Sequence, residues 1–409
     1  MSFGLTPLTD AGIRFVSAAE RLIPEFRERA SVADREGAIC VENFEAMQTS
    51  KVAAAFVPES LGGFGLVSVL DWLCGIAALA RGDGSSAIGI NMHLGVSRGM
   101  AGAYDRARRK GGKGEQVAKP LTAIAAGKML ICATATERGT DNLHPQTTAT
   151  LTDDGWMING HKMFVTMSPI ATHLAMNLKM RGEDDEDCLG TVLLPIDTQG
   201  ILPQDDWDSL GMRGSGSQSI SFENAVVPKH SVRKIGPWGR WSIDLLINRT
   251  LGNLPLVAAF MGIAQHAHEI AMASLATQKR LGKLVNSSSG VQQLVGEMEI
   301  ELATCQSILQ RTGAAVDDWL LRAEHTPPTI EDGHHLMKEY QCAKWVVNRG
   351  AISIVDKAMD LVGGAGFMSA HPLTQLYRDV RAGPFMQPHA PTEIRGYVGQ
   401  VALGLYPEA

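Results

Sequence analysis

The order of its secondary-structure signals constrains this 409-residue chain more than any other feature. Residues 1–127 have the apolar spacing of helices, residues 128–236 have short β-rich runs separated by turn residues, and residues 237–409 return to long helices. A doubly wound sheet needs strands that alternate with helices, and no GxGxxG follows a strand here. The order therefore predicts an α+β chain with three domains: helical, β-barrel and helical.

The middle region is defined by turn residues at regular intervals. Asp153–Gly155 and Asn159-Gly160 are typical of tight turns between strands. The acidic run Arg181–Asp187 is expected to form an exposed hairpin loop. Short strands at this spacing favour a small antiparallel barrel.

The last region is defined by long amphipathic stretches that end near glycines or prolines. Helices are expected over Leu254–Leu281, Ser288–Ala323 and Gly333–Val362, with a shorter one over His371–Arg381. Long helices joined by short connections favour an antiparallel four-helix bundle.

Charge and cysteine usage exclude several classes of protein. The net charge is -6 and no basic stripe is present, which argues against a nucleic-acid partner. The six cysteines form no CxxC pair and the 12 histidines form no HExxH, so no metal site is expected. The cysteine pattern and the lack of a signal peptide favour reduced thiols in a cytoplasmic protein. No apolar run approaches the roughly 18–20 residues that cross a bilayer, so membrane insertion is not expected.

Four segments could carry chemistry, although each alone is equally well explained by an ordinary turn or helix end. They combine glycines with hydroxyl, acidic or aromatic side chains, which can bind phosphates or the edge of an aromatic ring. The segments are Thr134–Asp141, Ile158–Thr166, Asp206–Ser217 and Asp360–Phe367. The third lacks the lysine of a P-loop, so that motif is excluded.

Taken in order, these segments resemble the signatures of the acyl-CoA dehydrogenase superfamily over nearly the whole chain. The early Pro-Glu-x-x-Gly-Gly-x-Gly loop and the Trp-Ile-Thr element that stacks on the flavin also have similar counterparts. The matching segments are Pro58–Gly65, Thr136–Asp141, Phe164–Thr166, Leu210–Ser215, Phe222–Asn224, Gly363–Gly366 and Arg378-Asp379. One departure is Arg138, which stands where the family usually has proline. The segment Thr136–Asp141 is also two residues shorter than the corresponding flavin-contacting segment of the family.

The resemblance implies FAD in a cleft between the middle and C-terminal domains, completed by a second protomer of a homodimer or homotetramer. The residues that it implies for flavin binding are Thr134, Thr136, Thr140, Phe164 and Thr166, with Arg280, Gly363, Gly364 and Gly366 reaching the flavin of a neighbouring subunit. Arg213 is a candidate for substrate binding.

The usual catalytic glutamate of the family is missing from both places where it occurs. Counting from the Arg-Asp pair reaches Gln387, or His389 if two residues are inserted, and the alternative position in the first bundle helix is Gly252. Histidine has a pKa suited to proton transfer, so His389 is the candidate base and Glu393 the fallback.

Three functions remain open at this point. The first is α,β-dehydrogenation of an acyl-CoA-type thioester with an atypical base, with electrons passed to an electron-transfer flavoprotein. The second is a monooxygenase of the same fold, which would take reduced FMN from a flavin reductase and use O2 on a hydrophobic substrate. The third is a non-catalytic flavin- or acyl-binding homologue. The dehydrogenase is the main prediction and the monooxygenase its alternative.

Overall fold

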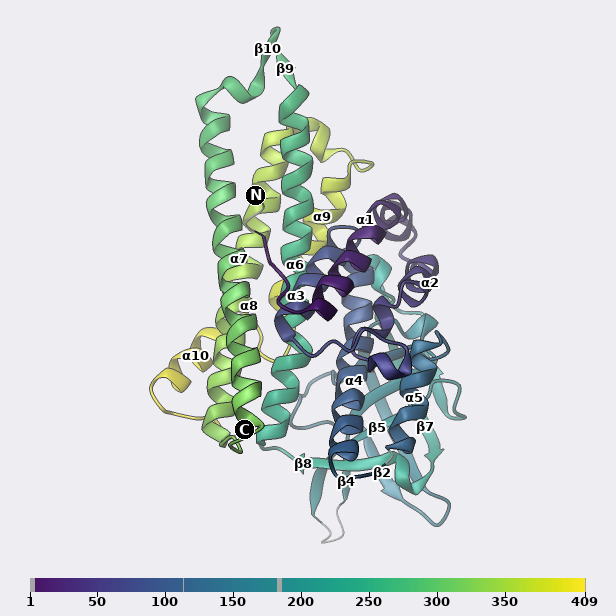
Figure 1. Ribbon diagram of the computed structural model, residues 1–409. Helices are drawn as coiled ribbons and strands as arrows, with labels where there is room; N and C mark the ends of the chain where they lie inside the picture. The colour runs from purple at the N-terminus through teal and green to yellow at the C-terminus, as the bar shows by residue number, and fades with distance from the viewer. Residues whose placement is uncertain (1–3, 113, 182–185, 409) are drawn as a thin grey trace.

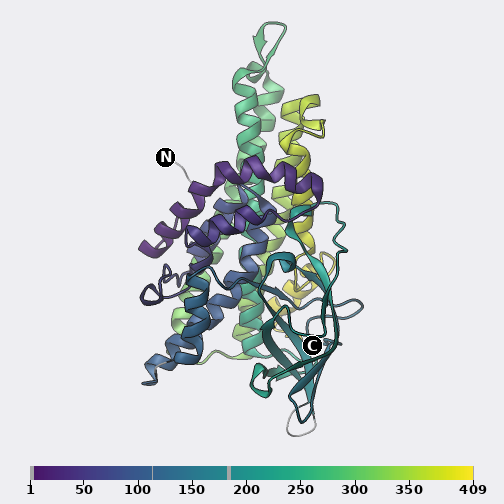
Figure 2. The same cartoon turned by 90° about the vertical axis from the view of Figure 1, so that its right-hand side faces the viewer.

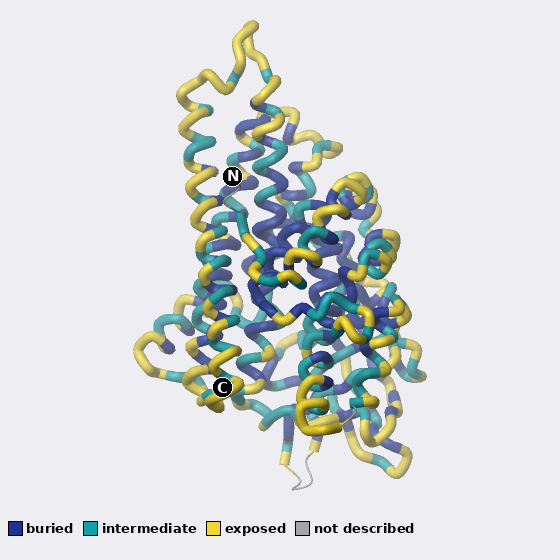
Figure 3. The backbone as a smooth tube through the Cα atoms, viewed as in Figure 1, coloured by how far each residue is buried: buried dark blue, intermediate teal, exposed yellow. Residues whose placement is uncertain are grey.

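The computed structural model describes residues 4–112, 114–181 and 186–408, and its elements follow the expected order (Figure 1). The first region is helical. Its helices are α1 (Asp10–Glu36), α2 (Val41–Thr49), α3 (Val69–Ala80), α4 (Gly84–Arg109) and α5 (Glu115–Ala125). Figure 3 shows the buried backbone concentrated where this region, the barrel and the bundle meet.

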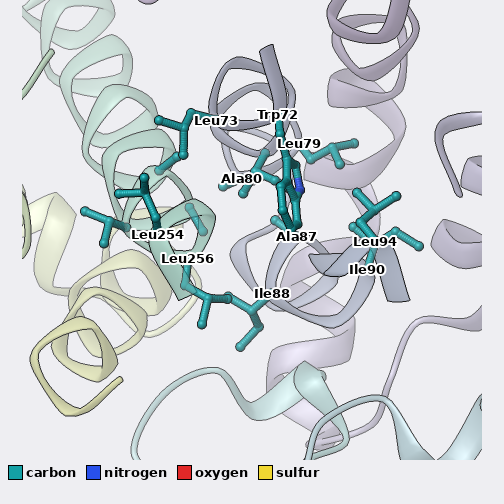
Figure 4. Close-up of a cluster of buried hydrophobic side chains, with 14 of the residues drawn as sticks. Trp72, Leu73, Leu79, Ala80, Ala87, Ile88, Ile90, Leu94, Leu254 and Leu256 are labelled. Carbon is teal, nitrogen blue, oxygen red and sulfur yellow. The ribbon is translucent and has the colours of Figure 1, made fainter. Parts of the chain in front are cut away.

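The helix α3 is the centre of the apolar core. Every residue of α3 is buried, which fits its nearly uninterrupted apolar sequence. Its Ser68 cap accepts a hydrogen bond from the backbone N–H of Asp71, and Asp83 caps α4 in the same way. Trp72 of α3 and Leu94 of α4 lie in a cluster that also holds Leu254 of the bundle (Figure 4). The N-terminal helices are thus packed directly against the bundle.

The middle region is one sheet in which most pairs are antiparallel. Its path runs β6-β7-β3-β2-β4-β5-β8, and β1 pairs with β4. The strands are β1 (Ile131–Thr134), β2 (Thr148–Leu151), β3 (Trp156–Val165), β4 (His173–Arg181), β5 (Asp187–Pro195), β6 (Ile201–Pro203), β7 (Gln218–Val227) and β8 (Val232–Pro237). The pairs β1–β4 and β2–β4 are parallel, which the purely antiparallel expectation missed.

The expected turn at Asn159-Gly160 is wrong, because both residues lie inside the continuous strand β3. The pairing of β3 with β7 shifts register between Ile158 and Gly160, so a bulge replaces the turn. Gly160 has a φ of 147°, and a Cβ there would lie 2.6 Å from the Cα of Thr147. Glycine is therefore needed here because the backbone at Thr147, directly before β2, lies so close. The acidic hairpin loop falls partly on 182–185, outside the described residues, although β4 and β5 pair antiparallel on either side of it.

The last region consists of three long helices with short ones beside them. These are α6 (Ile243–Thr277), α7 (Ser289–Ala323), α8 (Ile330–Val362), α9 (Pro372–Asp379) and α10 (Ile394–Ala402), and the hairpin β9 (Lys279–Arg280) with β10 (Lys283–Leu284) connects α6 to α7. The hairpin lies at the tip of the bundle, far from the barrel in both views (Figures 1 and 2).

The helix α6 begins 11 residues before its expected start at Leu254. Ser242 caps it by accepting a hydrogen bond from the N–H of Leu245, and Pro255 is accommodated inside it. It is long and apolar enough to cross a membrane by length and composition, but 72% of its most apolar window is buried inside the fold. Its composition is explained by its position as a core helix between α3 and α8.

Candidate functional site

The ends of β1 and β3 form a polar edge of the sheet. Thr134 donates its hydroxyl to the carbonyl of Met163 at 2.8 Å, and the N–H of Met163 donates to the carbonyl of Thr136 at 3.0 Å. Beside them, the hydroxyls of Thr166 and Ser217 are 2.9 Å apart. The structure thus brings three of the predicted threonines to one place, which we call the barrel edge (Thr134, Thr136, Phe164 and Thr166).

Phe164 is the unusual residue of the barrel edge. It is 50% exposed and has a φ of 52°, a left-handed conformation that is rare for an aromatic residue. The pairing with β7 shifts between Lys162 and Val165, both fully buried, so the bulge turns the Phe164 ring outward. Its ring meets Trp207 edge-on at 5.9 Å between centroids. An outward aromatic ring held in a strained backbone is a candidate ligand contact.

The loop 386–389 closes over the barrel edge from the C-terminal region. Gln387 donates from Nε2 to the Thr136 hydroxyl at 2.7 Å. Two residues of α8 hold the loop from below: the hydroxyl of Tyr340 donates to the carbonyl of Gln387, and the ammonium of Lys344 donates to the carbonyls of Met386 and His389. Lys344 is only 1% exposed, and burial lowers its pKa to about 7.

His389 lies at the end of this loop in an aromatic environment. Its ring stacks on Tyr397 with 4.2 Å between centroids, and its Nε2 atom is buried without a hydrogen-bond partner among the described residues. Burial is the main cause that lowers the pKa of His389 to about 4, so the ring is neutral at neutral pH. Glu393, the fallback base, accepts a hydrogen bond from the N–H of Ala390 at 2.8 Å and precedes the first turn of α10. Its carboxylate therefore has a structural partner.

The other carboxylate near the barrel edge is also occupied. Glu137 is bound to the fully buried ammonium of Lys162 and accepts hydrogen bonds from the N–H groups of Gln146 and Thr147. Burial raises the pKa of Glu137, but Lys162 and these hydrogen bonds outweigh it and hold the pKa below its usual value. Glu137 is thus an ionised structural group rather than an available base.

Several predicted residues lie elsewhere in the single chain. Thr140 donates its hydroxyl to the carbonyl of His144, and Arg213 donates to the carbonyl of Asp34 at 2.9 Å. Arg280 lies in the hairpin at the bundle tip, where β9 is exposed. The glycines Gly363, Gly364 and Gly366 follow the end of α8, and an added Cβ at the first two would meet nothing within 4 Å. Their roles in flavin or substrate binding stay predictions.

The barrel edge fits a flavin. An isoalloxazine ring needs an aromatic or apolar face and hydrogen-bond donors along its polar edge, and Phe164 with the hydroxyls of Thr136 and Thr166 offers both. The described residues contain no group of three histidine, cysteine, aspartate or glutamate side chains placed to hold a metal ion. All six cysteines are free.

Some residues of the site were missed from sequence. Lys344 and Tyr340 lie on the buried face of α8, where a charged residue among apolar neighbours was a usable signal. Tyr397 and Arg249 carry no motif, and only the fold shows that Tyr397 supports His389 and that Arg249 is buried beside the barrel.

Comparison with known proteins agrees with this geometry. The model of the acyl-CoA dehydrogenase middle domain matches residues 131–225, and that of the acyl-CoA dehydrogenase C-terminal domain matches residues 250–387. The putative acyl-CoA dehydrogenase YdbM of Bacillus subtilis is 30% identical over 89% of this chain and 90% of its own length. The predicted fold and superfamily are confirmed.

Two further relatives are a nitrososynthase and a protein crystallised with FMN. L-evernosamine nitrososynthase of Micromonospora sp. is 31% identical over 98% of this chain and 92% of its own length. A crystal structure of KijD3 with FMN and dTDP-3-amino-2,3,6-trideoxy-4-keto-3-methyl-D-glucose is 29% identical, with a TM-score of 0.90 over 100% of this chain and 98% of that chain. These relatives support the predicted flavin cofactor, and they favour the monooxygenase alternative over the main prediction of dehydrogenation.

Proposed function

The chain belongs to the acyl-CoA dehydrogenase superfamily of flavin-dependent oxidoreductases, and on that basis we propose that it is a reduced-flavin-dependent monooxygenase that oxidises the amino nitrogen of a nucleotide-linked sugar. The substrate class comes from its relatives, namely a nitrososynthase and a protein crystallised with a dTDP-linked amino sugar.

The observation that carries the proposal is the lack of an available carboxylate at the barrel edge. Dehydrogenation of a thioester requires a base that removes the α-proton. Among the described residues, Glu137 beside this edge is bound to Lys162, and Glu393 is exposed after the 386–389 loop and accepts from the N–H of Ala390. The loop position of the family's base is filled by Gln387, whose amide is bound to Thr136. Oxygenation of an amine does not need that carboxylate.

The reaction fits the groups that are present. Bound reduced flavin would supply two electrons to O2, so that one oxygen atom enters the amine as N–OH and the other leaves as water. An amine reacts through its nitrogen lone pair and must be unprotonated. Because burial lowers the pKa of His389 to about 4, the ring is a weak base, and its neutral form can instead accept a hydrogen bond from the unprotonated amine and hold it in place. The stack on Tyr397 and the hydrogen bonds from Lys344 to the His389 carbonyl fix its position.

The cofactor in this proposal is FMN rather than FAD, and the partner is a flavin reductase rather than an electron-transfer flavoprotein. FMN is the flavin found with KijD3. The flavin ring would rest on Phe164, with its polar edge at the threonine hydroxyls of the barrel edge. Because reduced flavin must be exchanged with the reductase, we expect weaker flavin binding than in a dehydrogenase. A cytoplasmic location stays a prediction.

A homo-oligomer is also part of the proposal. Leu281 is 99% exposed in the β9–β10 hairpin, and Phe367 is 80% exposed after the glycine turn. Exposed large apolar groups at one end of the bundle are typical of a covered surface. We propose that a second copy covers them and thereby brings Arg280 towards its flavin, and the mass of the native protein in solution tests this.

Oxygen uptake tests the function. The purified chain, FMN, NADH and a flavin reductase are mixed with a dTDP-linked amino sugar, and the control lacks only the amine. Because free reduced FMN itself reacts with O2, the control gives the background oxygen uptake, and we expect a product heavier by one oxygen atom only when the amine is present. Anaerobic bleaching of the bound flavin by an acyl-CoA, without any oxygenated product, would instead support dehydrogenation.

A further inference from the structure

The first turns of α6 contain a partly buried cation, Arg249, two of whose three guanidinium nitrogens are buried without a partner among the described residues. The Nε and Nη2 atoms of Arg249 are buried and donate no hydrogen bond to any described residue, and no described carboxylate forms an ion pair with them. Burial lowers the pKa of Arg249 to about 10, so the guanidinium is still charged at neutral pH. A buried charge with unused donors is costly to fold unless something else binds it.

Two other arginines beside α6 share a carboxylate. At the opposite half of the helix, Glu269 receives Arg27 at 2.5 Å and Arg81 at 2.6 Å. No described carboxylate forms such an ion pair with Arg249. That contrast indicates a ligand rather than a structural partner.

The local charge at Arg249 is positive. Burial is the main cause that lowers the pKa of Lys162, and the nearby charge of Arg249 lowers it further. Glu137 neutralises Lys162 directly. Two cations and one carboxylate leave one positive charge, which is the complement of a single anionic group.

The neighbouring surface leaves room for a ligand. An added Cβ at Gly252, one turn from Arg249, would meet nothing within 4 Å. Across from it on α4, Asn91 donates from Nδ2 to the carbonyl of Gly252 at 3.0 Å, while its buried Oδ1 atom has no partner among the described residues. The adjacent strand β1 is tied to α4 by a hydrogen bond from the N–H of Ile131 to His93. The start of α6 is thus next to α4, which contacts β1, and the side of α6 at Gly252 is open.

This space lies on the other side of β3 from the flavin face. Lys162, whose pKa is lowered by the charge of Arg249, is fully buried, whereas the bulge turns Phe164 outward. A flavin ring against Phe164 and an anion at Arg249 would therefore be held on different sides of the same strand end. The arrangement separates a cofactor contact from a second, anionic contact.

We propose that Arg249 binds a phosphate of the substrate's diphosphate group, and that this contact, with Asn91 beside it, selects a nucleotide-linked substrate. The inference rests on the proposed function. It assigns the anionic part of the substrate to the start of α6 and the reacting amine to the space near His389. The phosphate of FMN is the competing source of the same chemistry, and the test separates the two.

The test compares Arg249→Gln and Arg249→Met with the wild type and with Arg109→Gln, a control arginine that is 70% exposed and paired to Glu324. Binding of thymidine diphosphate, FMN and riboflavin is measured by calorimetry or fluorescence. We expect the dissociation constant of thymidine diphosphate to rise at least about tenfold in both Arg249 variants. FMN and riboflavin binding should change less than about threefold, and the control should match the wild type.

Each other outcome contradicts the inference. If FMN binding weakens about tenfold while riboflavin binding does not, Arg249 belongs to the flavin phosphate. If thymidine diphosphate binds all variants equally, or does not bind the wild type, the anionic site is not at Arg249. Oxygen uptake with reduced FMN is measured in parallel, so that loss of the proposed function is distinguished from loss of this contact. A melting temperature of Arg249→Met at or above that of the wild type shows that the variant is folded.

Discussion

The two halves of α6 contrast sharply. From Leu254 onward the helix is packed into the dry core against α3, where Leu254 and Phe260 are completely buried and a Cβ at Gly262 would lie 2.3 Å from the carbonyl of Ala77. In the first turns, Gly252 faces open space and Arg249 has unused donors. One half is built for packing and the other leaves polar groups for a ligand. Stability and function are thus separated along a single helix.

The largest effect is expected on the polar side of that contrast, at His389. We predict that His389→Ala lowers the rate of amine oxygenation by about 10²-fold, because the hydrogen-bond acceptor that positions the reacting amine is lost, without unfolding the protein. Turnover with saturating reduced FMN and the melting temperature are measured together. His325→Ala, at an exposed residue of the α7–α8 connection, is the matched control. Full activity in His389→Ala would remove the histidine from the mechanism.

The next effect is a loss of stability in the packed half of α6, from Leu254 onward. Gly262→Ala is predicted to destabilise the fold by about 1–3 kcal/mol, because the methyl group would collide with the carbonyl of Ala77 and with Ala80. Denaturant titration followed by circular dichroism measures it. Unchanged stability would mean that α3 and α6 are not closely packed.

A smaller effect of opposite sign is expected at the unpaired cation. Arg249→Met should stabilise the protein without ligand by about 1–2 kcal/mol, because a charge with no partner is removed from the interior. The free energy of unfolding is compared with and without thymidine diphosphate. A loss of stability in the ligand-free variant would show that Arg249 has a structural role.

Gly252 offers a smaller test within the same helix. Gly252→Ala is predicted to stabilise α6 by about 0.5–1 kcal/mol, since alanine restricts the unfolded chain and its Cβ meets nothing. Substrate affinity should fall at the same time if the open space holds substrate. Gly262→Ala is the paired comparison, because it is expected to change the free energy of unfolding in the opposite direction. Equal changes from the two substitutions would contradict the difference between the two halves of α6.

The smallest effect concerns pH. Because burial lowers the pKa of His389 to about 4, the neutral ring is present above that pH and is lost only as pH falls through it. Activity should therefore vary less than about twofold between pH 6 and 8 from this group. The buried position would be contradicted if kcat/KM decreased at low pH with an apparent pKa near the ordinary histidine value, and if this decrease were absent in His389→Ala.

The sequence predicted the fold well because each region has its own periodicity. Helical spacing located α7 within a residue, since Ser288 precedes it and Pro327-Pro328 follows it. The start of α6 was missed because Arg249 and Asn253 interrupt the apolar pattern that Leu254 resumes, and the side chain of Asn253 donates to the carbonyl of Arg249 within the helix.

The candidate site was predictable only in part. The threonines and Phe164 lie within motifs, so the barrel edge could be assembled from sequence. The inward cation Arg249 and the support of His389 by Lys344 and Tyr397 depend on contacts between residues far apart in the chain. No local pattern encodes such contacts. Likewise, the absence of a free carboxylate could be read from sequence, but the partners of Glu137 and Glu393 could not.

The central claim is that the barrel edge serves oxygen transfer to nitrogen rather than removal of hydrogen from carbon. The most direct measurement supplies the enzyme with reduced FMN, isotopically labelled ¹⁸O2 and a dTDP-linked amino sugar and, separately, with oxidised flavin and an acyl-CoA, and analyses both products by mass spectrometry. We predict one labelled oxygen atom in the amine product and no change in the thioester. Conversion of the thioester to a product lacking two hydrogen atoms with oxidised flavin, and no label in the amine, would contradict the account.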